Sequence, residues 1–240
     1  MTAVGAEPVR VAMWSGPRNI STALMRSFGA RPDTVVVDEP LYAHYLAVTE
    51  IDHPGRAAVL ASQPTRWEEA AAALTGPLPD GIGVHYQKHM AHHLLPDVGR
   101  GWVGRLRNAF LIRDPEHVVA SYAKVRGAPT LADLGYVQQV EILRAYGGPV
   151  VDAADLLRDP AGVLARLCAA LGIGFDRAML AWPPGRRPTD GVWAEHWYAS
   201  VEASTGFAPY DPRPVEVPAH LRALVAEARP YYDELAAHRL

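Results

Sequence analysis

Cysteine, excess charge and long apolar runs are all scarce in this 240-residue sequence. Its one cysteine, Cys168, cannot form an internal disulfide, and the apolar residues around it at helical spacing favour core packing over a nucleophile. The formal net charge is −3, so the protein as a whole carries no basic field for nucleic acid or an anionic membrane. A site for an anionic ligand must therefore be local.

The sequence also contains no recognisable targeting segment. Residues 1–14 lack a positively charged stretch followed by an apolar stretch and a cleavage site, and no apolar run approaches the roughly 18 residues of a membrane span. We therefore expect a cytoplasmic protein with no membrane and no nucleic-acid partner. The oligomeric state stays open.

The length and composition are those of one globular domain, residues 1–240. Apolar residues make up 49% and charged residues 20% of the chain, which is ordinary for a well-filled α/β domain. Runs rich in β-formers alternate with helical stretches, which predicts a mostly parallel sheet of about five strands with helices on both faces. The predicted strands are Val9–Trp14, Thr34–Val37, Gly83–Gln87, Ala109–Ile112 and Pro149–Val151.

Helices are predicted between and after these strands. Asp159 and Pro160 are typical of an N-cap and a first helical turn, and Gly172 is typical of a helix end. Residues 181–218 differ, because they are rich in proline and glycine yet carry three tryptophans, and we expect a long loop that folds back over a site. The predicted helices are Ile20–Phe28, Leu131–Tyr146, Gly162–Leu171 and His220–Ala237.

A candidate anion site follows the first predicted strand. A loop between a strand and a helix points backbone N–H groups and the positive end of the helix dipole at one place. Arg18 adds a charge whose fork matches phosphate oxygens, and Ser21 and Thr22 add hydroxyl donors. The alternative is a plain turn in which a hydroxyl caps the helix. The loop of nucleotide triphosphatases is not present, because its second glycine and its lysine are missing.

The same loop carries a resemblance to a known family. It resembles the Pro-Lys-Ser-Gly-Thr-Thr loop with which sulfotransferases hold the 5′-phosphosulfate of 3′-phosphoadenosine 5′-phosphosulfate (PAPS), with arginine replacing lysine and isoleucine replacing glycine. The resemblance implies a P-loop-type α/β fold and PAPS as the donor cosubstrate. The implied PAPS-binding residues of the loop are Pro17, Arg18, Asn19, Ile20, Ser21 and Thr22.

A second segment, from Phe110 to Tyr122, resembles the part of the family that binds the 3′-phosphate of PAPS. Arg113 follows a predicted strand and Ser121 lies eight residues later in a predicted helix, as in the family. The resemblance implies that both side chains contact the nucleotide. The alternative is a buried pair of Arg113 with Asp114, beside a serine without a role.

A third segment, from Arg186 to Trp197, resembles the family's Arg-Lys-Gly-x-x-Gly-x-Trp-x-x-His-Phe. The resemblance implies PAPS contacts from Arg186, Arg187 and Trp193. Pro188 stands where the family has a glycine whose N–H can reach phosphate, so that one contact is lost. The alternative is two solvated arginines beside tryptophans that fill the core.

Sulfonate transfer is an in-line displacement that depends on positioning and electrostatics, and it needs no metal when cations are in place. Arg18 is expected to bind the leaving phosphate. Lys88 is expected to donate to the bridging oxygen, since residues 88–96 resemble the family's Lys-Thr-His-Leu-Pro-x-x-Leu-Leu-Pro. Met90, however, stands at the position of the family's catalytic histidine and cannot accept a proton.

The base must therefore be another residue. Glu39, at the end of the second strand, is the first candidate, because sites in α/β folds form at the carboxyl ends of strands. His92 is also a candidate, as are His89 and His93, and the alternative role for Glu39 is capping a helix or pairing with Arg18. His89 and His93 are spaced like a metal pair on a helix, but no third ligand is evident, and no metal site is predicted.

The resemblance implies a sulfotransferase that moves a sulfonate group from PAPS to a hydroxyl or amine of a small-molecule acceptor. A first alternative is a non-catalytic protein that binds PAPS or its product, 3′-phosphoadenosine 5′-phosphate (PAP), and has lost turnover with methionine at position 90. A second is a small-molecule kinase that uses ATP on the same kind of sheet.

Overall fold

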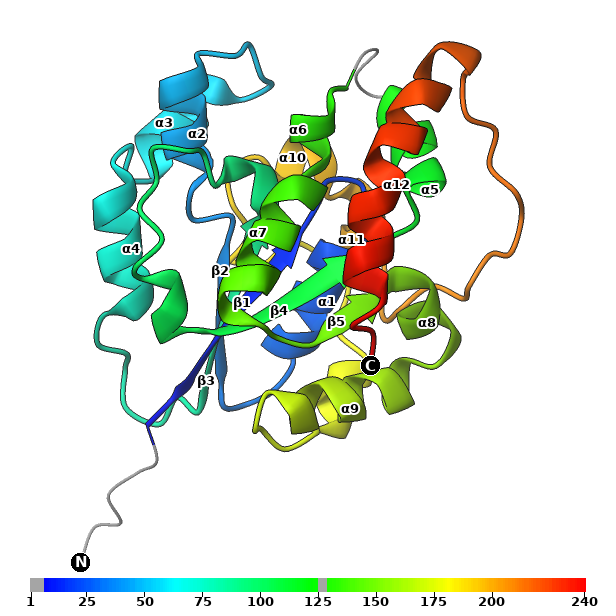
Figure 1. Cartoon of the computed structure of the whole chain (residues 1–240). Coiled ribbons are helices and arrows are strands. Elements are labelled where there is room, and N and C mark those ends of the chain that lie inside the picture. Colours follow the sequence, from blue (N-terminus) through cyan, green and yellow to red (C-terminus); the bar gives the residue numbers. More distant parts are fainter. Residues whose placement is uncertain (1–6, 125–128) are drawn as a thin grey trace, which may run out of the picture.

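A parallel β-sheet forms the centre of the molecule. The structure is a computed structural model that describes residues 7–124 and 129–240. Within these residues five strands pair in the order β2-β3-β1-β4-β5, and every pairing is parallel (Figure 1). The strands are β1 (Val9–Ser15), β2 (Thr34–Asp38), β3 (Val84–Met90), β4 (Arg107–Ile112) and β5 (Val150–Asp152).

All five predicted strands form, and the predicted fold class is confirmed. Their ends differ from the prediction by at most three residues. The difference matters at β3, which continues through Lys88 to Met90 before a short 3₁₀ turn, η1 (Ala91–His93). His92 and His93 therefore lie in this turn, whereas His89 belongs to the strand. The spacing of His89 and His93 thus does not place them on one helix face.

Helices cover both faces of the sheet, which explains why the strands read as uninterrupted apolar runs. Alternate residues of β1 point to opposite faces: Ala12 and Trp14 to one core, Val11 and Met13 to the other. The first core is covered by α4 (Trp67–Thr75), α5 (Pro115–Ala123), α7 (Tyr136–Tyr146) and α12 (Arg222–Ala236). The second is covered by α1 (Ser21–Gly29), α2 (Tyr42–Thr49), α8 (Ala153–Arg158) and α9 (Pro160–Ala170). Shorter helical elements are α3 (Arg56–Ser62), α10 (Ala194–Trp197), α11 (Ala199–Glu202), η2 (Val103–Arg105), η3 (Arg177–Leu180) and η4 (Ala219–Leu221).

The predicted helix Leu131–Tyr146 is in fact two helices. Gly135, with φ of 76°, ends α6 (Leu131–Leu134) and begins α7. A side chain there would come within 3.2 Å of Ala91 Cβ, and a side chain at Gly16 would come within 2.3 Å of the Leu134 carbonyl oxygen. The α6–α7 corner therefore packs directly on the loop after β1 and on the turn after β3. This close packing fixes both loops at one edge of the sheet.

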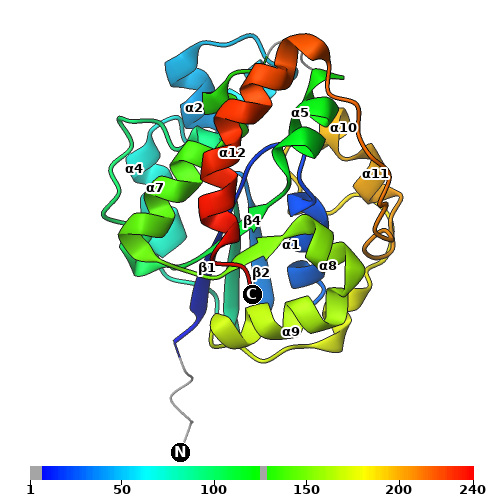
Figure 2. The same cartoon turned by 45° about the vertical axis from the view of Figure 1, so that its right-hand side comes forward.

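Aspartates cap two of the helices. Asp159 accepts a hydrogen bond from the Gly162 N–H in α9, as predicted, and Asp114 accepts one from the Glu116 N–H at the start of α5. Asp114 also forms an ion pair with Arg229 of α12, at 2.8 Å, so the pair with Arg113 considered above does not form. α12 lies beside α7 and α5 in both views (Figures 1 and 2). It begins two residues later than predicted, after η4.

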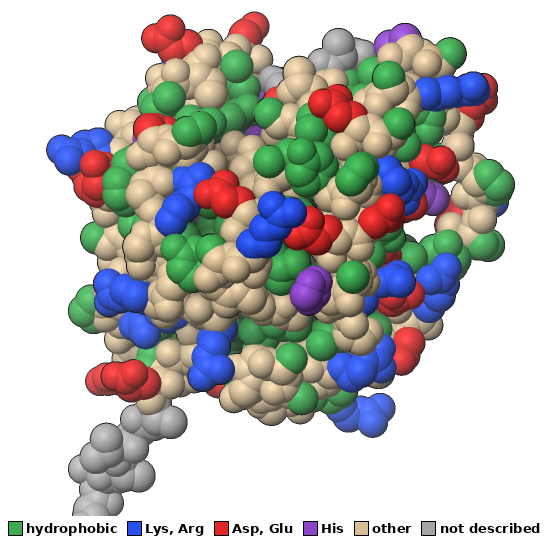
Figure 3. Space-filling view, in the orientation of Figure 1, with side chains coloured by type: hydrophobic (Ala, Val, Ile, Leu, Met, Phe, Trp, Pro, Cys, Tyr) green, Lys and Arg blue, Asp and Glu red, His purple; other side chains and the backbone are tan. Residues whose placement is uncertain are grey.

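Charges of both signs are interspersed over the face that carries α7 and α12 (Figure 3). Arg144 of α7 pairs there with Glu234 of α12 at 2.7 Å, and Arg100 pairs with Glu141 at 3.0 Å. Such exposed pairs contribute little to stability, about 0–1 kcal/mol each. They give the covering helices a solvated outer surface.

Candidate active site

A cavity of about 690 Å³ opens at the carboxyl ends of the strands. The chain leaves the central strand β1 for β2 on one side and later enters β4 on the other, and such a switch point is where α/β sheets bind ligands. The lining comes from the loop after β1, the ends of β2, β3 and β4, and residues 197–208. Eleven of the fourteen predicted site residues line it: Pro17, Arg18, Asn19, Ile20, Ser21, Thr22, Glu39, Lys88, His92, Arg113 and Ser121.

The loop after β1 meets the segment after β4, although the two are about a hundred residues apart. Arg18 Nε donates to Ser121 Oγ at 3.1 Å, and Arg113 Nη1 donates to the Arg18 carbonyl at 2.9 Å. Asn19 Nδ2 ties the loop to β4 by donating to the Leu111 carbonyl at 2.9 Å. We call the loop Pro17–Ala23, with Arg113 and Ser121, the cationic wall.

The cationic wall is poorly neutralised by the protein. Among the described residues no carboxylate forms an ion pair with Arg18 or Arg113. Burial lowers the pKa of Arg113, and the neighbouring Arg18 cation lowers it further. The first turn of α1 adds its N–H groups and dipole, and no side chain in the described part of the chain caps this helix. Two cations beside an open helix N-terminus form a site for an anion.

Arg18 has a left-handed backbone, with φ of 55°. Glu39, which also lines the cavity, has φ of 42°. This region costs energy for any residue with a side chain, and such strain concentrates at functional sites. The side chains of these two residues line the same cavity.

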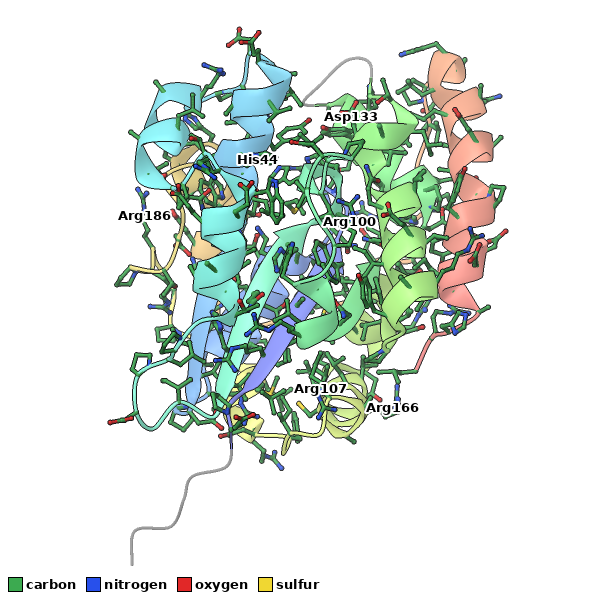
Figure 4. The ribbon with its side chains drawn as sticks, turned by 60° about the vertical axis from the view of Figure 1, so that its left-hand side comes forward. His44, Arg100, Arg107, Asp133, Arg166 and Arg186 are labelled. Carbon is green, nitrogen blue, oxygen red and sulfur yellow. The ribbon has the colours of Figure 1, made fainter. Side chains whose placement is uncertain are left out.

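The structure does not bring Arg186, Arg187 or Trp193 to the cavity wall. Arg186 is exposed and projects from the outside of the molecule (Figure 4). The Arg187 side chain donates to the Pro183 carbonyl, and Trp193 is 1% exposed within the core. The assignment of these three residues to PAPS binding stays a prediction.

The segment that carries these residues is nevertheless held to α1 by an ion pair of Asp190. Asp190 forms a buried, two-pronged ion pair with Arg26 of α1, with one contact at 2.6 Å, and it also accepts from the Arg187 N–H. Within the predicted loop, residues 181–218, the part that lines the cavity is Trp197, Tyr198 and residues 200–201 and 203–208.

Lys88 lies at the end of β3 within a cluster of acceptors. Its Nζ donates to Asp38 Oδ1 at 2.9 Å, to Glu39 Oε1 at 2.5 Å and to Tyr198 OH at 2.9 Å. Burial acts to lower the pKa of Lys88, but the carboxylates of Asp38 and Glu39 outweigh it, and the pKa lies well above its ordinary value. The lysine is therefore a fixed cation.

Glu39 is the carboxylate of this cluster that reaches the cavity. Its side chain is 11% exposed, whereas that of Asp38 is 1% exposed. Burial raises the pKa of Glu39 and the Asp38 charge raises it further, while Lys88 opposes both. A carboxylate with a raised pKa, at the wall of a cavity, can serve as a general base near neutral pH.

Aromatic rings cover the part of the cavity next to Glu39. His93 stacks on Tyr42 and on Tyr45, with ring centroids 4.7 Å apart in each case. Burial lowers the pKa of His93 well below its ordinary value, so this imidazole is neutral. We call these rings the aromatic wall: Tyr42, Tyr45, His53, His92, His93 and Trp197.

The histidines differ in what they can reach. His92 and His93 line the cavity. His89 does not; it stacks on Trp14 in the core, and burial lowers its pKa to about 3. No group of three or more histidine, cysteine or acidic side chains that could hold a metal ion occurs among the described residues.

Sequence reasoning missed several residues of the site. Asp38 lies one residue beyond the predicted end of the second strand, directly opposite Lys88 in the β2–β3 register. The sequence signal for this contact was a carboxylate at the end of one parallel strand and a lysine at the end of another. Tyr42, His53 and Tyr198 carried no comparable signal.

A protein-family model for the sulfotransferase domain matches residues 9–239 of the chain. The chain belongs to the sulfotransferase domain family. The predicted family is thereby confirmed.

Among curated proteins, this sulfotransferase domain is similar to two from Arabidopsis thaliana. It is 38% identical over 241 residues to branched-chain-amino-acid aminotransferase-like protein 1, covering 97% of the chain and 42% of that protein. It is 33% identical to branched-chain-amino-acid aminotransferase-like protein 2, covering 94% of the chain and 41% of that protein. The chain thus spans about two fifths of the length of these relatives.

Solved structures of sulfotransferases share the fold. The sulfotransferase domain of the Synechococcus PCC 7002 olefin synthase has a TM-score of 0.57 and 18% identity, covering 98% of this chain and 96% of that one. A sulfotransferase from Alicyclobacillus acidocaldarius has a TM-score of 0.55 and 15% identity, covering 98% of each chain. In the described part of this sulfotransferase domain, no helix is long and apolar enough to cross a membrane.

Proposed function

We propose that this sulfotransferase domain transfers a sulfonate group from PAPS to a hydroxyl or amine of a small-molecule acceptor. One observation supports this most: Arg18 and Arg113 meet at the N-terminus of α1 without a carboxylate partner among the described residues, and they share a cavity with Lys88 and Glu39. Two cations that could hold an anion therefore share one cavity with a lysine and a carboxylate that could serve as acid and base.

The cationic wall fits the phosphates of the donor. Arg18, the hydroxyls of Ser21 and Thr22, and the N–H groups of the first turn of α1 would hold the 5′-phosphosulfate. Arg113 and Ser121 would hold the 3′-phosphate. Arg186, Arg187 and Trp193 stay proposed contacts that would require residues 186–193 to approach the ligand.

The chemistry then falls to Glu39 and Lys88. PAPS supplies an activated sulfonate when bound. Glu39 would take the proton of the acceptor as the acceptor oxygen or nitrogen bonds to sulfur. Lys88 would donate a hydrogen bond to the bridging oxygen, which leaves with the electron pair of the broken S–O bond. Arg18 would stabilise the charge on the departing phosphate, leaving PAP and a sulfated acceptor. His92 is the second candidate for the base.

The aromatic wall supports a small, partly apolar acceptor. Its rings provide a large apolar surface with few fixed charges, and Glu39 is the carboxylate at its border. An alcohol, a phenol or an amine would each present its reacting atom to Glu39 from this side. The aminotransferase-like name of the relatives describes whole proteins, of which this chain matches about two fifths. We therefore draw no activity from that name.

The test is a two-stage assay on the purified protein. Thermal melting with PAP, PAPS, ATP and ADP should show stabilisation by the 3′-phosphorylated nucleotides in preference to the others. A mass-spectrometric screen of alcohols, phenols and amines with PAPS should then show sulfated product. Preference for ATP over PAP would instead indicate a kinase.

Met90 favours a second candidate function, a non-catalytic PAP- or PAPS-binding protein. It lines the cavity at the position of the family's catalytic histidine, and its thioether cannot accept a proton. Stabilisation by PAP without sulfated product from any acceptor would support this candidate. Product formation would exclude it.

A further inference from the structure

The hydrogen bonds of Lys88 leave none of its three N–H donors unused. One goes to Asp38, one to Glu39 and one to Tyr198. The ammonium side chain is 1% exposed. If Lys88 donates to the oxygen of a leaving group, it must first release one of these partners.

The three partners differ in what their release would cost. Asp38 is a buried carboxylate and Tyr198 a buried hydroxyl, so either would lose a charged partner away from water. Glu39 faces the cavity, so its carboxylate can give up the hydrogen bond from Lys88 and bind the proton of an acceptor instead. Glu39 is therefore the partner that Lys88 can leave.

Asp38 and Tyr198 are themselves held by other elements. Tyr198 OH donates to Asp38 Oδ2 at 2.7 Å and accepts from Trp193 Nε1 at 3.2 Å. Asp38 Oδ2 also accepts from the Gly191 N–H at 3.2 Å. Burial raises the pKa of Tyr198 well above its ordinary value, and Asp38 adds to the effect, so the hydroxyl keeps its proton. The network joins β2 and β3 to the segment 190–198.

We propose that Asp38 and Tyr198 are positioning residues that hold Lys88 from its buried side, so that only the N–H directed at Glu39 turns to the leaving oxygen. The proposal rests on the proposed sulfonate transfer. In this proposal one hydrogen bond, from Lys88 Nζ to Glu39 Oε1, breaks. Its loss frees the Glu39 oxygen to act as a base and, at the same time, frees the Lys88 N–H to act as a donor.

The small number of lysines in the sequence allows the Lys88 ammonium group to be observed separately by NMR. Lys88 and Lys124 are the only lysines among the 240 residues, and Lys124 is exposed. NMR on protein labelled with ¹⁵N-lysine should therefore show one slowly exchanging side-chain ammonium, from Lys88, while Lys124 exchanges rapidly with water. This measurement needs neither donor nor acceptor.

The main variant is Tyr198→Phe, which keeps the ring and removes the hydroxyl. We expect the hydrogen exchange of the Lys88 ammonium to speed up at least about tenfold and kcat to fall about 10- to 100-fold, while the KM for PAPS stays within about threefold. Asp38→Asn, a second variant of the same shape, should also lower the pKa of Lys88, because it removes one carboxylate.

Tyr232→Phe is the matched control. Its hydroxyl donates to buried Asp152 at 2.7 Å, away from the cavity lining. It should change neither Lys88 exchange nor kcat. The proposal is overturned if Tyr198→Phe leaves the exchange rate at the wild-type value, if exchange rises while kcat is unchanged, or if Tyr232→Phe causes the same losses. Absence of sulfonate transfer by the wild type would instead refute the proposed function, and the exchange data would still show whether Asp38 and Tyr198 hold Lys88.

Discussion

The cavity carries two kinds of cation that the protein treats in opposite ways. Arg18 and Arg113 stand together, with no carboxylate ion pair among the described residues, and Arg18 is exposed. Lys88 is buried and bonded to two carboxylates and a phenol. In the proposed reaction the arginines would gain a charged partner when the donor binds, whereas the lysine would give one up.

This difference separates binding from chemistry. Cations without partners stabilise a bound phosphate directly, since no internal ion pair has to break first. A cation that already has three acceptors adds little to ground-state binding and can act only when the reaction rearranges its bonds. Substitutions on the cationic wall should therefore change affinity, and substitutions around Lys88 should change turnover.

The largest effect is expected at Glu39. Glu39→Gln should lower kcat about 10²- to 10⁴-fold, the usual contribution of a general base, while PAP affinity stays within a few-fold. Steady-state kinetics and calorimetry measure the two quantities. Glu141→Gln, which changes an exposed carboxylate paired with Arg100, is the control. Near-normal turnover in Glu39→Gln together with its collapse in His92→Ala would assign the base to histidine.

The next effect is expected at Arg113. Arg113→Ala should weaken PAP binding about 10- to 150-fold, because a charge-assisted contact to phosphate is worth about 1.5–3 kcal/mol. Calorimetry on this variant and on Arg144→Ala, an exposed arginine of α7, gives the comparison. Equal PAP affinity in Arg113→Ala and the wild type would remove the cationic wall as the nucleotide site.

Turnover should also depend on pH through Glu39. Only the ionised carboxylate can take a proton, and burial raises its pKa above the ordinary value of 4.5, so the active form is lost at a higher pH than usual. Below that raised pKa, kcat should fall about tenfold per pH unit. A pH profile at saturating substrate checks this. A limb at or below pH 4.5, or one that persists in Glu39→Gln, would contradict the assignment.

The smallest effect is expected at Arg186. Its side chain projects from the outside of the molecule, so Arg186→Ala should change PAP affinity less than about twofold as long as residues 186–193 keep this position when the nucleotide binds. The same calorimetry as for Arg113→Ala measures it. A loss as large as that of Arg113→Ala would show that residues 186–193 move to the ligand, as the family resemblance implies.

The sequence predicted the sheet and the cationic wall because both depend on local patterns. Buried parallel strands read as apolar runs, and a loop between a strand and a helix carries its anion site in adjacent residues. The contact of Arg18 with Ser121 joins two such segments, and the resemblance to one family predicted that they belong together.

The surroundings of Lys88 could not be predicted in this way. Tyr198 lies 110 residues away from Lys88 in the sequence, and its contact depends on the packing of Trp193 and Asp190. The break at Gly135 was missed for a related reason. A glycine in a helical pattern is tolerated in many helices, and the left-handed backbone of Gly135 and its close packing against Ala91 are seen only in the structure.

The left-handed backbone of Arg18 has a consequence for protein engineering. Glycine relieves strain at a positive φ, and the Arg18 side chain is exposed, so a screen for thermostability would reward Arg18→Gly. Glu39 also has a positive φ, but its carboxylate pairs with the buried Lys88 ammonium, and glycine there would remove that partner. Stabilising this protein by directed evolution would therefore select against the role that the proposed reaction assigns to Arg18, unless the selection also required ligand binding or turnover.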